Sequence, residues 1–216
     1  MDSDASRIAV TGGLEAVRRR PLLYYGVPLD DPGLPGVVLS LAVRDALTEE
    51  ATDAPLRVRV VIEGPRRFSV EDNGPGIPLA RSGPDGALVL TEPMTTLLCG
   101  RPAVYKTGMA VVTALCAEAV ADVWHDGRHY RQRADWTAEP RPLETLEPSD
   151  RHGTRVTYRL RDAYLSPAAA LPDRPDALLQ QLFVPPPERP DIPRPGPETT
   201  IELIDRRDGT RTLLLP

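Results

Sequence analysis

A strand pair that runs into a glycine-bracketed turn is the feature that most restricts the fold of this chain. Residues 56–63 alternate between polar and aliphatic side chains, residues 64–65 (Gly-Pro) make a turn, and residues 68–71 return as an antiparallel partner. The hairpin leads into residues 72–78, Asp-Asn-Gly-Pro-Gly-Ile-Pro. Because glycine tolerates positive φ and exposes bare backbone, Asp72 would offer a carboxylate at the mouth of a pocket. The same spacing is also typical of an Asx-turn that closes a hairpin.

Hydrophobic periodicity predicts helices early in the chain and antiparallel strands later. Helices are expected over residues 13–20, 37–50, 94–98, 109–117 and 175–183, strands over 56–63, 68–71, 120–125, 129–134, 154–160, 200–205 and 210–215, and loops over 28–36 and 79–93. This order predicts a single α+β domain over residues 1–216, a two-layer sandwich of one mixed, mostly antiparallel sheet with helices on one face. Residues 1–12 are expected to form a loose arm and the proline-rich residues 185–197 a loop.

The composition restricts the partners of the chain. A formal net charge of −5 argues against a surface that holds nucleic acid by neutralising phosphates. Two cysteines make neither a disulfide framework nor a metal-ligand cluster, and neither a signal peptide nor an apolar run of membrane-spanning length is apparent. We therefore expect a cytoplasmic protein with no membrane partner. The 25 prolines are typical of a high-GC bacterium.

Several short motifs follow one another in a specific order. They are Gly13 to Pro21, Tyr24-Tyr25-Gly26, Asp45 followed by Glu49-Glu50-Ala51, Asp72 to Pro78, Tyr105-Lys106, Gly108 at the start of an apolar helix, Asp126 to Gln132, Gly153-Thr154, and Ile201 to Gly209. In this order they resemble the ATPase domain of the B subunits of DNA gyrase and topoisomerase IV, over nearly the whole chain. The resemblance implies the GHKL (Bergerat) α/β sandwich, which holds ATP between a helix layer and a glycine-rich lid.

The resemblance also implies roles for individual positions at the adenine end of the site. Asp72 matches the family Asp that accepts a hydrogen bond from the adenine amino group, and Thr154 matches the Thr that lies beside it through water. Pro75 stands where the family usually has Arg. The remaining ligand-binding positions carried over are Gly74, Gly76, Ile77, Pro78, Met94, Lys106 and Gly108.

At the phosphate end the family pattern is broken. The general-base position, Glu in the family, falls on Ala42, and the Mg²⁺-ligand position, Asn in the family, falls on Ala46. A methyl group neither takes a proton nor binds a cation. The lid is reduced to residues 105–108, in which Lys106 either meets a phosphate or is a solvated charge. We therefore expect a pseudo-ATPase with no catalytic residue, metal site or required cofactor, in which a nucleotide binds, if at all, without Mg²⁺-dependent turnover.

Three functions remain open at this stage. The first is a binding module for a planar small molecule, adenine-like or like a gyrase-inhibiting antibiotic, as a monomer or weak homodimer. The second is a repurposed enzyme of specialised metabolism that uses side chains of the former nucleotide cleft. Candidates for that chemistry are His125, His129, His152, Asp72 and Glu71. The third is an interaction role for the proline-rich strip 185–197, whose alternative is a plain surface loop. Weak residual ATP binding or hydrolysis is a further alternative, whereas topoisomerase activity is not expected, because we expect no transducer or TOPRIM domain.

Overall fold

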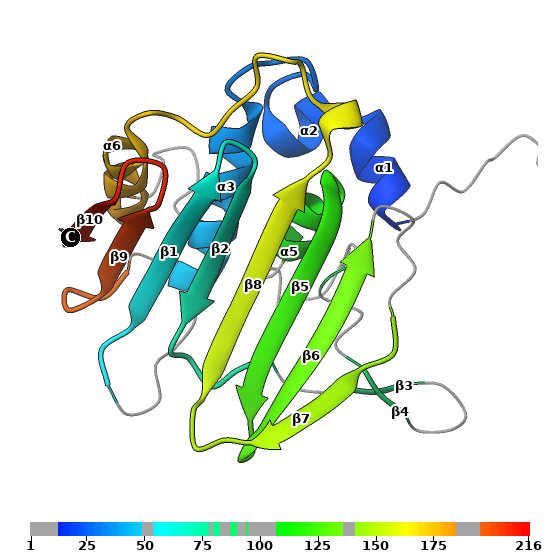
Figure 1. Ribbon diagram of the computed structural model, residues 1–216, viewed down its shortest axis with the longest axis vertical. Helices are drawn as coiled ribbons and strands as arrows, with labels where there is room; N and C mark the ends of the chain where they lie inside the picture. The colour runs from blue at the N-terminus through cyan, green and yellow to red at the C-terminus, as the bar shows by residue number, and fades with distance from the viewer. Residues whose placement is uncertain are drawn as a thin grey trace, which may run out of the picture.

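The computed structural model has an eight-stranded sheet that carries its helices on one face (Figure 1). It describes residues 13–48, 54–77, 80–82, 87–89, 94, 107–135, 141–184 and 195–216. The strand order is β10-β9-β1-β2-β8-β5-β6-β7. Strands β1 and β9 run parallel, and the other neighbours in this sheet are antiparallel. The predicted α+β sandwich, with a mixed and mostly antiparallel sheet, is therefore confirmed.

The elements have the following bounds. The helices are α1 (Gly13–Arg19), α2 (Pro21–Tyr25), α3 (Leu34–Leu47), α5 (Thr107–Thr113) and α6 (Pro175–Gln180), with short 3-10 turns η3 (Asp162–Tyr164) and η4 (Gln181–Phe183). The strands of the main sheet are β1 (Arg57–Gly64), β2 (Arg67–Asp72), β5 (Cys116–His125), β6 (Arg128–Asp135), β7 (Glu144–Pro148), β8 (Gly153–Leu160), β9 (Thr200–Asp205) and β10 (Thr210–Leu214). Strands β3 (Ala80–Ser82) and β4 (Ala87–Val89) form a separate pair.

Two helix starts differ from the prediction, and proline explains both. Pro21 ends the first helix as expected, but it also begins α2, because proline lacks only an N–H that the first helical turn leaves unpaired. Helix α3 begins at Leu34, inside the predicted loop 28–36, with Pro35 in its first turn. A proline that opens a helix and one that interrupts it look alike in a single sequence, so the prediction placed this start too late.

The predicted helix 109–117 is wrong at its C-terminal end. Helix α5 ends at Thr113, and Cys116 already belongs to β5. Residues 109–117 are apolar except for Thr113, and a nearly continuous apolar run does not distinguish a buried helix from a buried strand. Strands β3 and β4 lie in a stretch predicted to be loop, and β7, which is mostly exposed, was not predicted.

The core lies between the sheet and the helix layer, and α3 is the helix that positions the pocket. It packs against β1 and β2 and buries Val38, Leu39 and Val43 completely. Burial of each such side chain contributes about 1.5 to 3 kcal/mol. On the sheet, the rings of Phe68 and Tyr158 lie 5.2 Å apart in neighbouring strands β2 and β8. In the part of the chain that the structure describes, no helix is long and apolar enough to cross a membrane.

Candidate functional site

The structure brings Asp72 and Thr154 together through strand pairing. Asp72 is the last residue of β2, and the antiparallel register places it directly opposite Thr154 in β8. Gly153 makes this approach possible, since it has a φ of +115° and a Cβ atom on it would lie 2.1 Å from the carbonyl oxygen of Asp72. Both Asp72 and Thr154 are buried. Two motifs about 80 residues apart in sequence thus form one polar pair.

The turn after Asp72 is held by hydrogen bonds from its backbone N–H groups to the side chains of Asp72 and Thr154. Asp72 Oδ1 accepts from the backbone N–H of Gly74 at 2.9 Å, which is the Asx-turn that the spacing had offered as an alternative. The N–H of Ile77 donates to Thr154 Oγ1 at 3.2 Å. Gly76 has a φ of +79°, and a Cβ there would lie 2.6 Å from the carbonyl oxygen of Trp124. Asp72 therefore caps its own turn and also lines a pocket, so the two interpretations of this residue hold together.

Two histidines hold the same turn through its carbonyl groups. His152 Nδ1 lies 3.0 Å from the carbonyl oxygen of Gly74, and His125 Nδ1 lies 3.0 Å from that of Pro75. A carbonyl oxygen only accepts, so Nδ1 carries the proton in both imidazole rings. These contacts fix two successive carbonyl groups of the turn.

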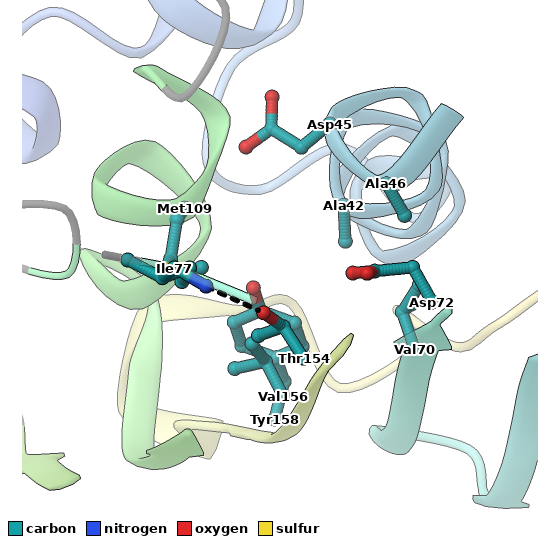
Figure 2. A pocket seen from close by; sticks show the side chains of 10 residues that line it. All are labelled: Ala42, Asp45, Ala46, Val70, Asp72, Ile77, Met109, Thr154, Val156 and Tyr158. Carbon is teal, nitrogen blue, oxygen red and sulfur yellow. Dashed lines mark hydrogen bonds between the residues drawn. The ribbon is translucent and has the colours of Figure 1, made fainter. Parts of the chain in front are cut away.

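The pocket lies between α3, α5 and the sheet (Figure 2). Its lining side chains are Ala42, Asp45, Ala46, Val70, Asp72, Ile77, Met109, Thr154, Val156 and Tyr158. The cavity is small, about 30 Å³, which is room for about two water molecules. A ring-sized ligand must therefore displace a lining side chain. Met109 is suited to move, because its unbranched side chain adopts many conformations at low cost.

The wall that α3 contributes carries methyl groups. Ala42 and Ala46 are one helical turn apart and both line the pocket opposite Thr154 and Val156 (Figure 2). Helix α3 also contributes one carboxylate to the pocket lining, that of Asp45, which lies against the start of α5. A Cβ atom on Gly108 would lie 2.6 Å from either carboxylate oxygen of Asp45, so glycine at this position lets the Asp45 side chain lie against the start of α5.

Tyr158 is a pocket residue that sequence reasoning missed. It follows Thr154 and Val156 on the same face of β8 and is 2% exposed. Burial, and then the charge of the nearby Asp45, raise the pKa of Tyr158 well above its usual value, so its hydroxyl keeps its proton. The period-two alternation of residues 154–160 could have pointed to it, since Tyr158 shares the inward face with Thr154.

Other predicted site residues lie elsewhere or outside the described residues. Met94 is completely buried but does not line this pocket, and Gly108 takes part through its packing on Asp45. Pro78 and Lys106 lie outside the described residues, as do most of the predicted helix 94–98, the arm 1–12 and most of the proline-rich strip 185–197.

Of the five candidate residues for repurposed enzyme chemistry, Asp72 alone lines this pocket, and Glu71 and His152 line a neighbouring cavity together with it. His129 contacts Asp122 at 2.8 Å, and Glu71 pairs with Arg151 at 2.6 Å. His125 and His152 are bound to the turn carbonyls described above. Within the described ranges, no group of three or more His, Cys, Asp or Glu side chains could hold a metal ion.

The fold and this pocket define a class of protein. A two-layer sandwich in which the Asp before a Gly-x-Gly turn pairs with a Gly-Thr strand beneath a helix layer has the GHKL type of ATP-binding fold. Comparison with known proteins then specifies the relatives. The chain is 35% identical over 178 residues to the B subunit of DNA gyrase from Thermus thermophilus, an alignment that covers 74% of this chain and 27% of that protein.

Further relatives agree with this assignment. The gyrase B subunit of Enterococcus faecalis is 32% identical over 72% of the chain and 25% of its own length. A gyrase B subunit of Streptomyces niveus described as novobiocin-resistant is 30% identical over 72% of the chain and 24% of its own length. No family model matches the chain. The chain therefore belongs to the family of the DNA gyrase B subunits, as a homologue of their ATPase domain, and it spans about a quarter of the length of these curated relatives.

Proposed function

We propose that this protein binds a small planar ligand in the pocket of Asp72 and Thr154 and does not hydrolyse ATP. The ligand is adenine-like or resembles a gyrase-inhibiting natural product. The observation that carries the proposal is that Ala42 and Ala46 line the same pocket as Asp72 and Thr154. The wall suited to recognising a heterocycle keeps its polar groups, whereas the wall that would activate water and hold Mg²⁺ offers two methyl groups.

The phosphate end of the pocket does not fit Mg²⁺-ATP. A general base must lie within hydrogen-bond reach of the attacking water, and its loss costs about 10² to 10⁴ in rate. Mg²⁺ needs oxygen ligands in near-octahedral geometry, which a methyl group at position 46 does not supply. Asp45 places a carboxylate at the start of α5, where it would repel a phosphate group. Asp72 and Thr154, by contrast, fit the donor and acceptor groups on the edge of an adenine-type ring.

The remaining alternatives have less support. The histidine contacts serve the turn and the sheet, which favours a binding role over new catalysis. A nucleic-acid partner is disfavoured because arginines on the uncovered face of the sheet are paired with acids, as in Arg59 with Glu202 at 2.6 Å and Arg155 with Asp122 at 3.0 Å. Arginines engaged in this way are less available to neutralise phosphates.

Isothermal titration calorimetry with adenosine, Mg²⁺-ATP and novobiocin tests the proposal, and one of the relatives named above suggests the third probe. We expect binding of adenosine or novobiocin, no gain in affinity from the triphosphate, and no release of phosphate from ATP. Asp72→Asn is the informative variant. Its amide oxygen can keep the hydrogen bond from Gly74, while its NH₂ group replaces the acceptor offered to the ligand.

A hydrogen bond to a charged group contributes about 1.5 to 3 kcal/mol, so Asp72→Asn should weaken binding by about ten- to a hundredfold. Asp208→Asn, in the turn between β9 and β10 and away from the pocket, is the matched control and should leave affinity unchanged. The proposal fails if the protein binds neither adenosine nor novobiocin, or if Asp72→Asn binds as the unmodified protein does. It also fails if Mg²⁺-ATP is hydrolysed at a rate that a pocket substitution such as Asp45→Asn abolishes.

A further inference from the structure

Tyr158 is a buried residue that lines the pocket, and its hydroxyl makes no hydrogen bond with another described residue. Tyr158 is 2% exposed and lines the cavity together with Thr154 and Val156 (Figure 2). Its hydroxyl makes no hydrogen bond with another described residue, and it is not among the fully enclosed side-chain atoms of the described residues that lack a partner, so it is open to the cavity. A buried tyrosine hydroxyl usually finds a partner, because leaving it without one costs free energy.

Tyr25 shows how the same fold treats a tyrosine with a structural role. It is 5% exposed, and its hydroxyl donates to the backbone carbonyl of Val111 at 2.8 Å. The two tyrosines are similarly buried, but one hydroxyl is used by the protein and the other is directed at a cavity. Tyr25 therefore serves as an internal comparison for Tyr158, because its hydroxyl bonds within the protein.

We infer that Tyr158 is a specificity-determining ligand group that donates its hydroxyl proton to an acceptor atom of the bound molecule. This inference rests on the proposed function and narrows the ligand class. Asp72 offers an acceptor, and Tyr158 offers a donor toward the middle of β8. The pocket then selects a planar heterocycle that carries both a donor, such as an exocyclic amine, and an acceptor, such as a ring nitrogen or a carbonyl oxygen.

Asp45 supports the assignment of Tyr158 as the donor. The carboxylate of Asp45 lines the same pocket, and together with burial it keeps the tyrosine protonated. A tyrosinate would accept hydrogen bonds from the ligand, whereas a protonated hydroxyl in this position can donate. A ligand that presents only donors to this pocket would leave the Tyr158 proton without an acceptor, and we expect it to bind more weakly.

Calorimetry on Tyr158→Phe tests the inference, with adenosine and novobiocin as probes. The variant removes one oxygen atom and keeps the ring, so we expect about two- to tenfold weaker binding of a probe that accepts from the hydroxyl. Deaza analogues of adenosine, each lacking one ring nitrogen, complete a double-mutant cycle with this variant. The analogue that lacks the accepting nitrogen should bind equally to both proteins. The inference is overturned if Tyr158→Phe binds both probes as tightly as the unmodified protein while Asp72→Asn does not, and the proposed function then stands without it.

Thermal unfolding provides a readout that needs no ligand. Tyr25→Phe loses a hydrogen bond and should lower Tm by about 3 °C, whereas Tyr158→Phe should leave Tm unchanged or raise it. If Tyr158→Phe loses as much stability as Tyr25→Phe, its hydroxyl has a partner within the protein and the inference is wrong. If neither probe binds the unmodified protein, the proposed function fails, and with it the ligand role of Tyr158. The Tm comparison then still decides whether the hydroxyl is open to the cavity.

Discussion

Gly153→Ala should damage the fold and the pocket together, because Gly153 meets the backbone of Asp72. Its φ of +115° lies in a region that residues with a side chain rarely adopt, which costs about 1 to 3 kcal/mol. The added Cβ would also lie 2.1 Å from the carbonyl oxygen of Asp72, so β2 and β8 must separate locally. We expect a total loss of at least about 3 kcal/mol, which for a domain of this size lowers Tm by about 6 to 12 °C.

Gly127→Ala is the matched control for this substitution. Gly127 has a φ of +72° in the turn between β5 and β6, and a Cβ there would have no atom within 4 Å. It should therefore cost only the left-handed backbone conformation, about 1 to 2 kcal/mol, or about 2 to 8 °C in Tm. The difference between the two variants isolates the close approach to Asp72.

Differential scanning calorimetry measures both variants, and titration with adenosine reports on the pocket. Gly153→Ala should weaken ligand binding as well as stability, since it displaces the residue that carries the acceptor, whereas Gly127→Ala should change stability alone. Equal Tm losses for the two variants would show that β8 does not approach Asp72 as closely as the structure indicates, and the geometric basis of the pocket would then be lost.

Two further outcomes follow from buried groups. Burial alone would raise the pKa of Asp122, but hydrogen bonds from Arg155, His129 and Arg131 outweigh it and hold the pKa below its usual value. Asp122→Asn should therefore lower the free energy of unfolding, measured in urea at neutral pH, by about 3 kcal/mol. The difference in stability between the two proteins should shrink as pH falls through the native pKa of Asp122. A difference that does not change with pH would contradict this assignment. Cys116 is fully buried, and burial raises the pKa of its thiol. In a Cys99→Ser variant, a thiol reagent should therefore label Cys116 only as fast as the protein unfolds. Rapid labelling of the native protein would refute this prediction.

Much of the local structure was determined by the sequence alone. The alternation of residues 57–62 specified which side chains of β1 are buried, and the apolar periodicity of residues 200–205 gave the bounds of β9. These patterns are readable because each depends on residues a few positions apart. The pairing of Asp72 with Thr154 was anticipated through resemblance to a known family, since no local pattern connects residues so distant in sequence.

Only the tertiary structure decided what surrounds that pair. Tyr158 becomes a pocket residue because β8 lies beneath α3 and Asp45, and His125 and His152 hold the turn because two distant segments meet at its carbonyl groups. The end of α5 and the start of β5 were likewise undecided by an apolar run compatible with either conformation. Burial of one face against the helix layer selects the strand, and this selection comes from packing between segments that the sequence places far apart.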